Sequence, residues 1–138
     1  MIISSNSILP ESRDYVVSIF TKLASLLADN GMLIAILPSF DTILYLKSLR
    51  EKNADDNDFE TRMNIDELAY ADDGDHLQCY HTINSIYRET ELSGLSLMAC
   101  PIKVYYPWGL CQKYDYGYYP HADEEIWDWF IVALKAKM

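Results

Sequence analysis

The sequence lacks several features that whole classes of protein require. No apolar run approaches the roughly 20 residues that a membrane-spanning helix needs. The first residues, MIISSNSILPES, contain neither a basic region nor a long apolar core, so they do not resemble a signal peptide. We therefore expect no membrane segment, no secretion signal and a cytoplasmic location.

Cysteine and basic residues are also scarce. The three cysteines, Cys79, Cys100 and Cys111, form no CxxC pair, which argues against a disulfide framework and a zinc site. The 11 Lys and Arg residues against 21 Asp and Glu residues give a net charge of −10. This sign disfavours nucleic acids and anionic membranes, because binding to a phosphate backbone requires Lys and Arg.

Metal-binding patterns are absent as well. The three histidines lie far apart in the sequence and form no HxH or HxxxH pair. The acidic run Asp72–Asp75 is predicted to be a solvated turn, because it lacks the downstream ligand spacing of an EF-hand. No metal is therefore expected.

What the sequence does contain is an ordinary globular composition, 50% hydrophobic over 138 residues. Met1–Ile3 predicts a short buried strand. Residues 10–29 predict an amphipathic helix, with Pro10 at its first position and Asn30-Gly31 as its stop. The apolar run Met32–Leu37 then predicts a strand buried on both faces, as in a parallel sheet.

The second half predicts further alternation of helix and strand. Ser39 is a plausible cap for another helix, and the acidic span Glu51–Asp75 is expected to hold a helical piece. Thr82 is expected to cap a helix over residues 83–92 that closes at Ser93-Gly94. Residues 95–106 and 126–134 predict two strands in an antiparallel hairpin, with Pro101 at an edge or a bulge.

Four segments in this order resemble the C-terminal half of a class I S-adenosylmethionine-dependent methyltransferase. They are Ile2–Pro10 (IISSNSILP), Leu27–Ser39 (LADNGMLIAILPS), Tyr87–Leu95 (YRETELSGL) and Ile126–Ala133 (IWDWFIVA). They look like the family's fourth strand, the passage into its fifth, the helix before its sixth and its closing seventh strand. The resemblance implies an α/β fold: half of a Rossmann-like sheet, with two parallel strands joined by a crossover helix, a helical segment and a terminal antiparallel hairpin.

The resemblance also has a large gap. The family's Gly-rich cofactor-binding turn has no counterpart, because the chain has no GxGxxG and its five glycines are scattered. Residues 1–138 thus look like one partial domain without the N-terminal Gly-rich half. The implied function is that of a fragment or subunit of an S-adenosylmethionine-dependent methyltransferase, inactive alone and with an unknown methyl acceptor. The alternative is a non-catalytic remnant or a protein-interaction module with an acidic surface.

The resemblance places candidate binding residues after two strands. Ser5, Asn6 and Ser7 follow the first strand and are the expected contacts of S-adenosylmethionine, although they could equally serve only to satisfy backbone groups. The expected acceptor-binding residues lie after the next strand and in the tyrosine-rich loop over residues 107–123. They are Pro38, Ser39, Phe40, Tyr118 and Tyr119.

For these residues too a structural role is open. Ser39 is expected to cap a helix in either case, and most of the tyrosines are expected to pack over the end of the sheet. No catalytic residue can be named. The expected partners are the complementary N-terminal half of a methyltransferase or a second copy in a homodimer, because the first strand would leave an unpaired edge.

Overall fold

The main sheet has β8 at its centre. We describe residues 1–45, 62–71, 76–105 and 126–137 of a computed structural model. β1 (Ile2–Ser5) pairs with β2 (Met32–Pro38) in parallel, and β2 pairs with β8 (Trp127–Lys135) antiparallel. β6 (Leu95–Leu97) and β7 (Ile102–Tyr105) pair one after the other with the far side of β8, both antiparallel. The fold is therefore α/β with a mixed sheet.

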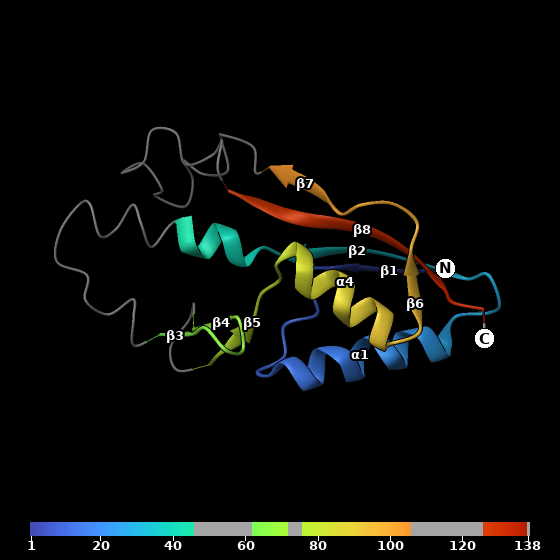
Figure 1. Cartoon of the computed structure of the whole chain (residues 1–138), viewed down its shortest axis with the longest axis horizontal. Helices are drawn as coiled ribbons and strands as arrows, with labels where there is room; N and C mark the ends of the chain where they lie inside the picture. The colour runs from blue at the N-terminus through green and yellow to red at the C-terminus, as the bar shows by residue number, and fades with distance from the viewer. Residues whose placement is uncertain (46–61, 72–75, 106–125, 138) are drawn as a thin grey trace, which may run out of the picture.

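Two helices lie together on one side of this sheet (Figure 1). α1 (Arg13–Leu26) connects β1 to β2 and turns Val16, Phe20 and Ala24, which are spaced by four residues, toward the sheet. α4 (Ile83–Leu92) begins with a capping box, in which Thr82 and Ser85 exchange side chain–backbone hydrogen bonds of 3.1 Å. Gly94, at φ +72°, adopts the left-handed conformation that ends α4.

The sheet face under these helices, the covered face, holds the core. Alternate residues of the central strands point to it because side chains alternate along a strand. On β2 these are Leu33, Ala35 and Leu37, each fully buried, and on β8 they include Ile131 and Ala133. They join the apolar residues of α1 and α4 in one cluster.

The opposite sheet face, the open face, is also apolar. Besides the buried Pro38, the strand registers place nine apolar side chains on it: Ile3, Met32, Ile34, Ile36, Phe130, Val132, Leu134, Ile102 and Val104. Those of β2 and β8 are half-buried, while Ile3 and Ile102 are 68% and 57% exposed. No helix lies on this side of the sheet in the described part of the chain (Figure 1). The open face therefore has the composition of a buried surface, and no helix of the described residues covers it.

A small antiparallel sheet lies beside the segment that leads to the N-terminus of α1. It consists of β3 (Met63–Asn64), β4 (Ala69–Tyr70) and β5 (Gln78–Cys79). The Cys79 N–H donates to the Pro10 carbonyl at 2.8 Å, which joins this sheet to the segment between β1 and α1.

Several expectations from the sequence are confirmed. β1 and β2 are parallel and connected by a helix, the last strands pair antiparallel, and α4 has the predicted bounds and cap. Residues 40–45 are helical, and the Ser39 hydroxyl accepts from the Thr42 N–H at 3.3 Å, as expected of a cap.

Other expectations are wrong. The helix predicted over residues 10–29 spans only Arg13–Leu26, and the Pro10 carbonyl is used by β5 instead. β1 is not buried, because it is an edge strand with one described neighbour, β2. β2 is buried on one face and only half-buried on the other.

Two further corrections concern the second half of the chain. The strand predicted over residues 95–106 is two strands, β6 and β7, separated around Pro101, which has no N–H for the ladder. The helical piece expected within Glu51–Asp75 is not helical over residues 62–71, which form β3 and β4 around a turn at Leu68. Residues 46–61 and 72–75, with the Asp72–Asp75 turn, lie outside the described residues.

Candidate functional site

Two of the three predicted groups of binding residues lie at the same end of the main sheet. Because β1 and β2 are parallel, Ser5–Ser7 and Pro38–Phe40 follow the carboxyl ends of adjacent strands. Ser5, Asn6 and Ser7 are exposed, and the Ser7 hydroxyl donates to the Ser5 carbonyl at 2.9 Å. The loop after β1 is thus accessible at the position where open α/β sheets bind ligands.

Asn6 fixes the position of this loop. Its φ of +47° lies in the left-handed region, which asparagine tolerates better than most residues. Its N–H donates to the Ile36 carbonyl at 2.9 Å, and its side-chain amide donates to Asp128 Oδ2 at 2.8 Å. Asn6 therefore connects the end of β1 to both β2 and β8. Asp128, which the sequence analysis did not identify, also lies at this end of the sheet.

The second predicted group, Pro38, Ser39 and Phe40, is buried beneath the surface at this end of the sheet. All three are buried, and Phe40 packs with Ile43 and two tyrosines of the small sheet and its flank. The two remaining predicted residues, Tyr118 and Tyr119, lie outside the described residues. The structure therefore brings two of the three predicted groups together, and only Ser5–Ser7 present accessible side chains.

Beneath the loop lies a buried charged network centred on Arg13, the first residue of α1. Its Nε donates to Glu89 Oε1 of α4 at 2.7 Å, and a second guanidinium nitrogen pairs with the same oxygen. The guanidinium also donates to the Tyr80 carbonyl, and the Arg13 N–H donates to Glu67 Oε2 at 2.6 Å. Because the Glu89 side chain is 5% exposed, this pair joins the two helices where water screens little.

His81 completes the network. Its ring is fully buried, with Nδ1 3.3 Å from Glu89 Oε2 and 3.4 Å from a guanidinium nitrogen of Arg13. Burial lowers the pKa of His81 below its usual value, while the neighbouring Glu89 carboxylate opposes this shift. The His81 carbonyl accepts from the Phe40 N–H at 2.9 Å and from the Trp129 indole at 3.0 Å. A neutral His81 therefore links α4, β8 and the end of β2.

Cys79 borders the same network but is not set up as a nucleophile. Burial raises the pKa of its thiol, and Arg13 offsets this only in part. The thiol is therefore protonated at neutral pH, and its role is packing.

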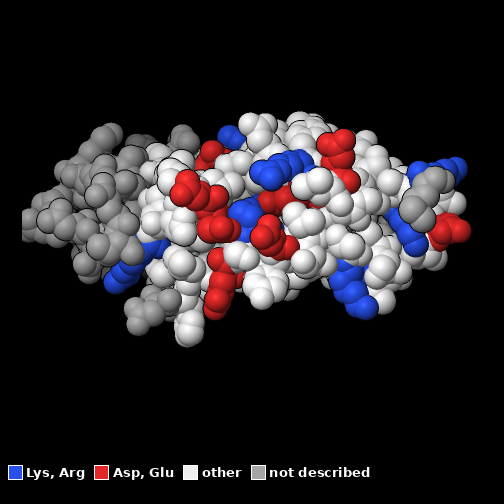
Figure 2. Space-filling view, turned by 60° about the horizontal axis from the view of Figure 1, so that its bottom comes forward, with Lys and Arg blue, Asp and Glu red and all other residues white. Residues whose placement is uncertain are grey.

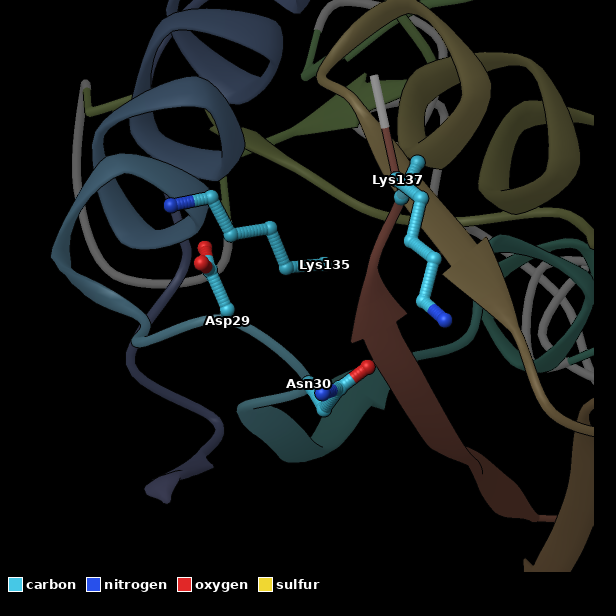
Figure 3. A pocket seen from close by; sticks show the side chains of 5 residues that line it. Asp29, Asn30, Lys135 and Lys137 are labelled. Carbon is cyan, nitrogen blue, oxygen red and sulfur yellow. The ribbon is translucent and has the colours of Figure 1, made fainter.

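The described residues line two hollows of similar size on the surface, and Ser5–Ser7 belong to neither of them. One of about 430 Å³ lies between α1 and α4 and is lined by Arg13, Arg88, Asp14, Asp66 and Glu89, among others. Figure 2 shows acidic residues gathered around basic ones on this helix side. The other, of about 440 Å³, lies at the opposite end of the sheet, where Lys135 donates to the Leu27 carbonyl at 2.9 Å. In Figure 3 the side chains of Lys135 and Lys137 point in different directions, so they do not converge on one ligand.

Sequence reasoning missed the buried network. In the sequence His81 is one of three scattered histidines, and no local pattern marks Arg13. The available signal was Glu89, because it lies one helical turn from Ile86 on the inward side of α4. A carboxylate on an apolar helix face requires a buried partner.

No known protein family matches this sequence, and no curated protein has significant similarity to it. In the described ranges no three His, Cys, Asp or Glu side chains gather as metal ligands. Within the same ranges no helix is both long enough and apolar enough to cross a membrane.

Proposed function

We propose that the chain is the carboxyl-terminal part of an S-adenosylmethionine-dependent methyltransferase unit, and that another part supplies the Gly-rich turn that binds the cofactor. The observation that carries this proposal is the state of β1. It is an apolar strand in parallel pairing with β2, and its other edge has no partner among the described strands. Such an edge is suited to accept a further strand.

The handedness of parallel connections says where the rest of such a unit belongs. Nearly all connections between parallel strands are right-handed. The connection from β1 through α1 to β2 has its helix on the covered face. Parallel strands added beyond β1 would extend the sheet away from β2, which is the opposite direction across its width. Right-handed connections between such strands would lie on the open face. The order of connections then reverses at β1, and ligands of open α/β sheets bind where this reversal occurs. Ser5, Asn6 and Ser7 lie at that point.

Methyl transfer fits a site with few acid–base groups, because positioning of donor and acceptor supplies most of the catalysis. The exposed hydroxyls and amide of the loop after β1 are suited to hydrogen-bond a polar cofactor such as S-adenosylmethionine. They line neither of the two hollows described above, and the Gly-rich turn would come from the second part, so we expect weak or no cofactor binding by this chain alone.

Two experiments test the proposal. The first reads the nucleotide sequence upstream of the Met1 codon and in adjacent genes, where a strand, a Gly-rich turn and a helix are expected. The second co-expresses this chain with that segment and titrates the complex with S-adenosylmethionine by calorimetry. Binding that weakens at least about tenfold in Asn6→Ala supports the proposal, whereas a stable complex that does not bind the cofactor contradicts it.

A second candidate function rests on the hollow between α1 and α4. Apart from the buried Arg13–Glu89 pair, its charged side chains are Asp14, Asp66 and Arg88, so carboxylates predominate in a chain of net charge −10. This favours a non-catalytic interaction module whose partner is a basic protein segment. Pull-down with the wild type and with Asp14→Asn/Asp66→Asn separates the two functions, because only the interaction module loses its partner in that variant.

A further inference from the structure

We propose that the free chain forms a homodimer in which the open face of one copy packs against the open face of the other. The two copies would be related by a two-fold axis, so that each contributes the same residues. This inference goes beyond the proposed function and concerns the chain before any completing part is bound.

The first argument is the composition of the surface. The open face presents nine apolar side chains and, among the described residues, a single charged one, Asp128. Asp128 is 7% exposed and accepts the hydrogen bond from Asn6, and Lys103 lies on the other side of the sheet, over the Trp127 ring. Two chains that each carry −10 can therefore approach through this face with little direct repulsion, since surface charges farther away are screened.

The second argument is area. β2 and β8 contribute seven and nine residues, and the flanking β1, β6 and β7 contribute four, three and four. At about 3.3 Å per residue and about 4.8 Å between strands, the patch has a projected area of about 430 Å². The accessible area of a corrugated side-chain surface is larger than this projection. This brings the patch toward the roughly 600 Å² per partner at the lower end of stable interfaces, so we expect a weak dimer whose population depends on concentration.

The third argument distinguishes the face from the edge. β1 has four residues, so pairing of two β1 edges alone would form a short ladder and bury little apolar area. Packing of the two faces instead covers Ile34 and Val132 at the centre of both copies, in the manner of two sheets stacked about 10 Å apart.

The test is sedimentation equilibrium of the full chain between about 1 and 100 µM. We expect a reversible transition from about 16 to about 32 kDa. Val132→Lys places two lysines together across the two-fold axis and should weaken the dimer at least about a hundredfold. Ile102→Lys changes a side chain that is already 57% exposed, so folding is not at risk, and it should weaken the dimer about tenfold.

Two control variants complete the design. Thr21→Lys adds the same charge on an exposed position of α1 and should leave the dimer intact. Ser5→Pro removes an N–H that points away from β2, because the next residue, Asn6, donates to Ile36; this variant blocks pairing through the edge. A dimer that persists in Ser5→Pro and dissociates in Val132→Lys and Ile102→Lys supports packing through the open face.

A chain that remains at 16 kDa at 100 µM overturns the inference, and so does a dimer that only Ser5→Pro dissociates. Neither result bears on cofactor binding by the completed unit, so this inference and the proposed function fail separately. By the handedness argument, a completing part would cover the same face and should displace the second copy.

Discussion

Leu33 and Ile34 are neighbours on β2, yet they lie in different surroundings. Leu33 is fully buried on the covered face, within the core formed with α1 and α4. Ile34, on the open face, is half-buried. The same alternation continues along β8, so two faces of nearly equal apolar character differ only in what lies over them. An apolar strand therefore indicates that both of its faces are meant to be covered, and it does not say by which polypeptide.

The largest expected difference in stability is between separate alanine substitutions of these two neighbours. Leu33→Ala should destabilise the chain by about 3–4 kcal/mol, because it removes buried methyl groups and leaves a cavity. Ile34→Ala should cost about 1 kcal/mol, since its side chain is only half-buried. Urea unfolding well below 1 µM, where the proposed dimer would be dissociated, measures both. Equal losses would mean that the two faces are equally covered in the monomer.

The buried ion pair should rank next. Glu89→Ala leaves the guanidinium of Arg13 without its main partner and should cost about 2–3 kcal/mol, below the value for a fully buried pair because Arg13 is 16% exposed. The double variant Arg13→Met/Glu89→Leu removes both charges and should regain most of this loss. If the double variant is as unstable as the sum of the single ones, the pair is not a coupled unit.

Much of the fold was predictable from local sequence signals. Thr82 and Gly94 bounded α4 correctly because a capping side chain and a left-handed glycine act within a few residues. The parallel pairing of β1 and β2 followed from the helix between them. The start of α1 was missed because the Pro10 carbonyl bonds to Cys79, a contact between residues 69 positions apart that no local pattern encodes.

The candidate site was predictable only in part. Ser5–Ser7 could be placed because they follow an apolar strand, and the structure adds that Asn6 is held by Asp128 across β2. The network of Arg13, His81 and Glu89 depends on three separate segments converging in space. In the sequence only Glu89, a carboxylate on the inward side of α4, indicates that such a network exists, and it does not identify Arg13 or His81 as its partners.

Acid should lower the free energy of unfolding through His81, which is buried under the covered face. Burial lowers the pKa of His81, so the unfolded chain takes up a proton near the ordinary value of about 6.5 while the folded chain resists it. The unfolded state then binds more protons, and stability falls as the pH drops below about 6.5. The urea midpoint should decrease from pH 7.5 to 5.5, and less so in His81→Gln than in the wild type. His76→Gln, at an exposed position, should keep the wild-type slope, and equal slopes in all three would remove His81 as the cause.

The smallest expected effect is at the cap of α4, which helps to cover the sheet. In Thr82→Ala the Ser85 N–H loses its 3.1 Å acceptor, and we expect a loss of about 1 kcal/mol, or roughly 3–4 °C in Tm. Thr82→Ser keeps the hydroxyl and should retain most of the wild-type stability. Amide hydrogen exchange should accelerate in the first turn of α4 and remain unchanged in β1, because β1 pairs with β2 and does not depend on this cap. Faster exchange in β1 as well would show that α4 supports the whole sheet, and that the two faces unfold as one unit.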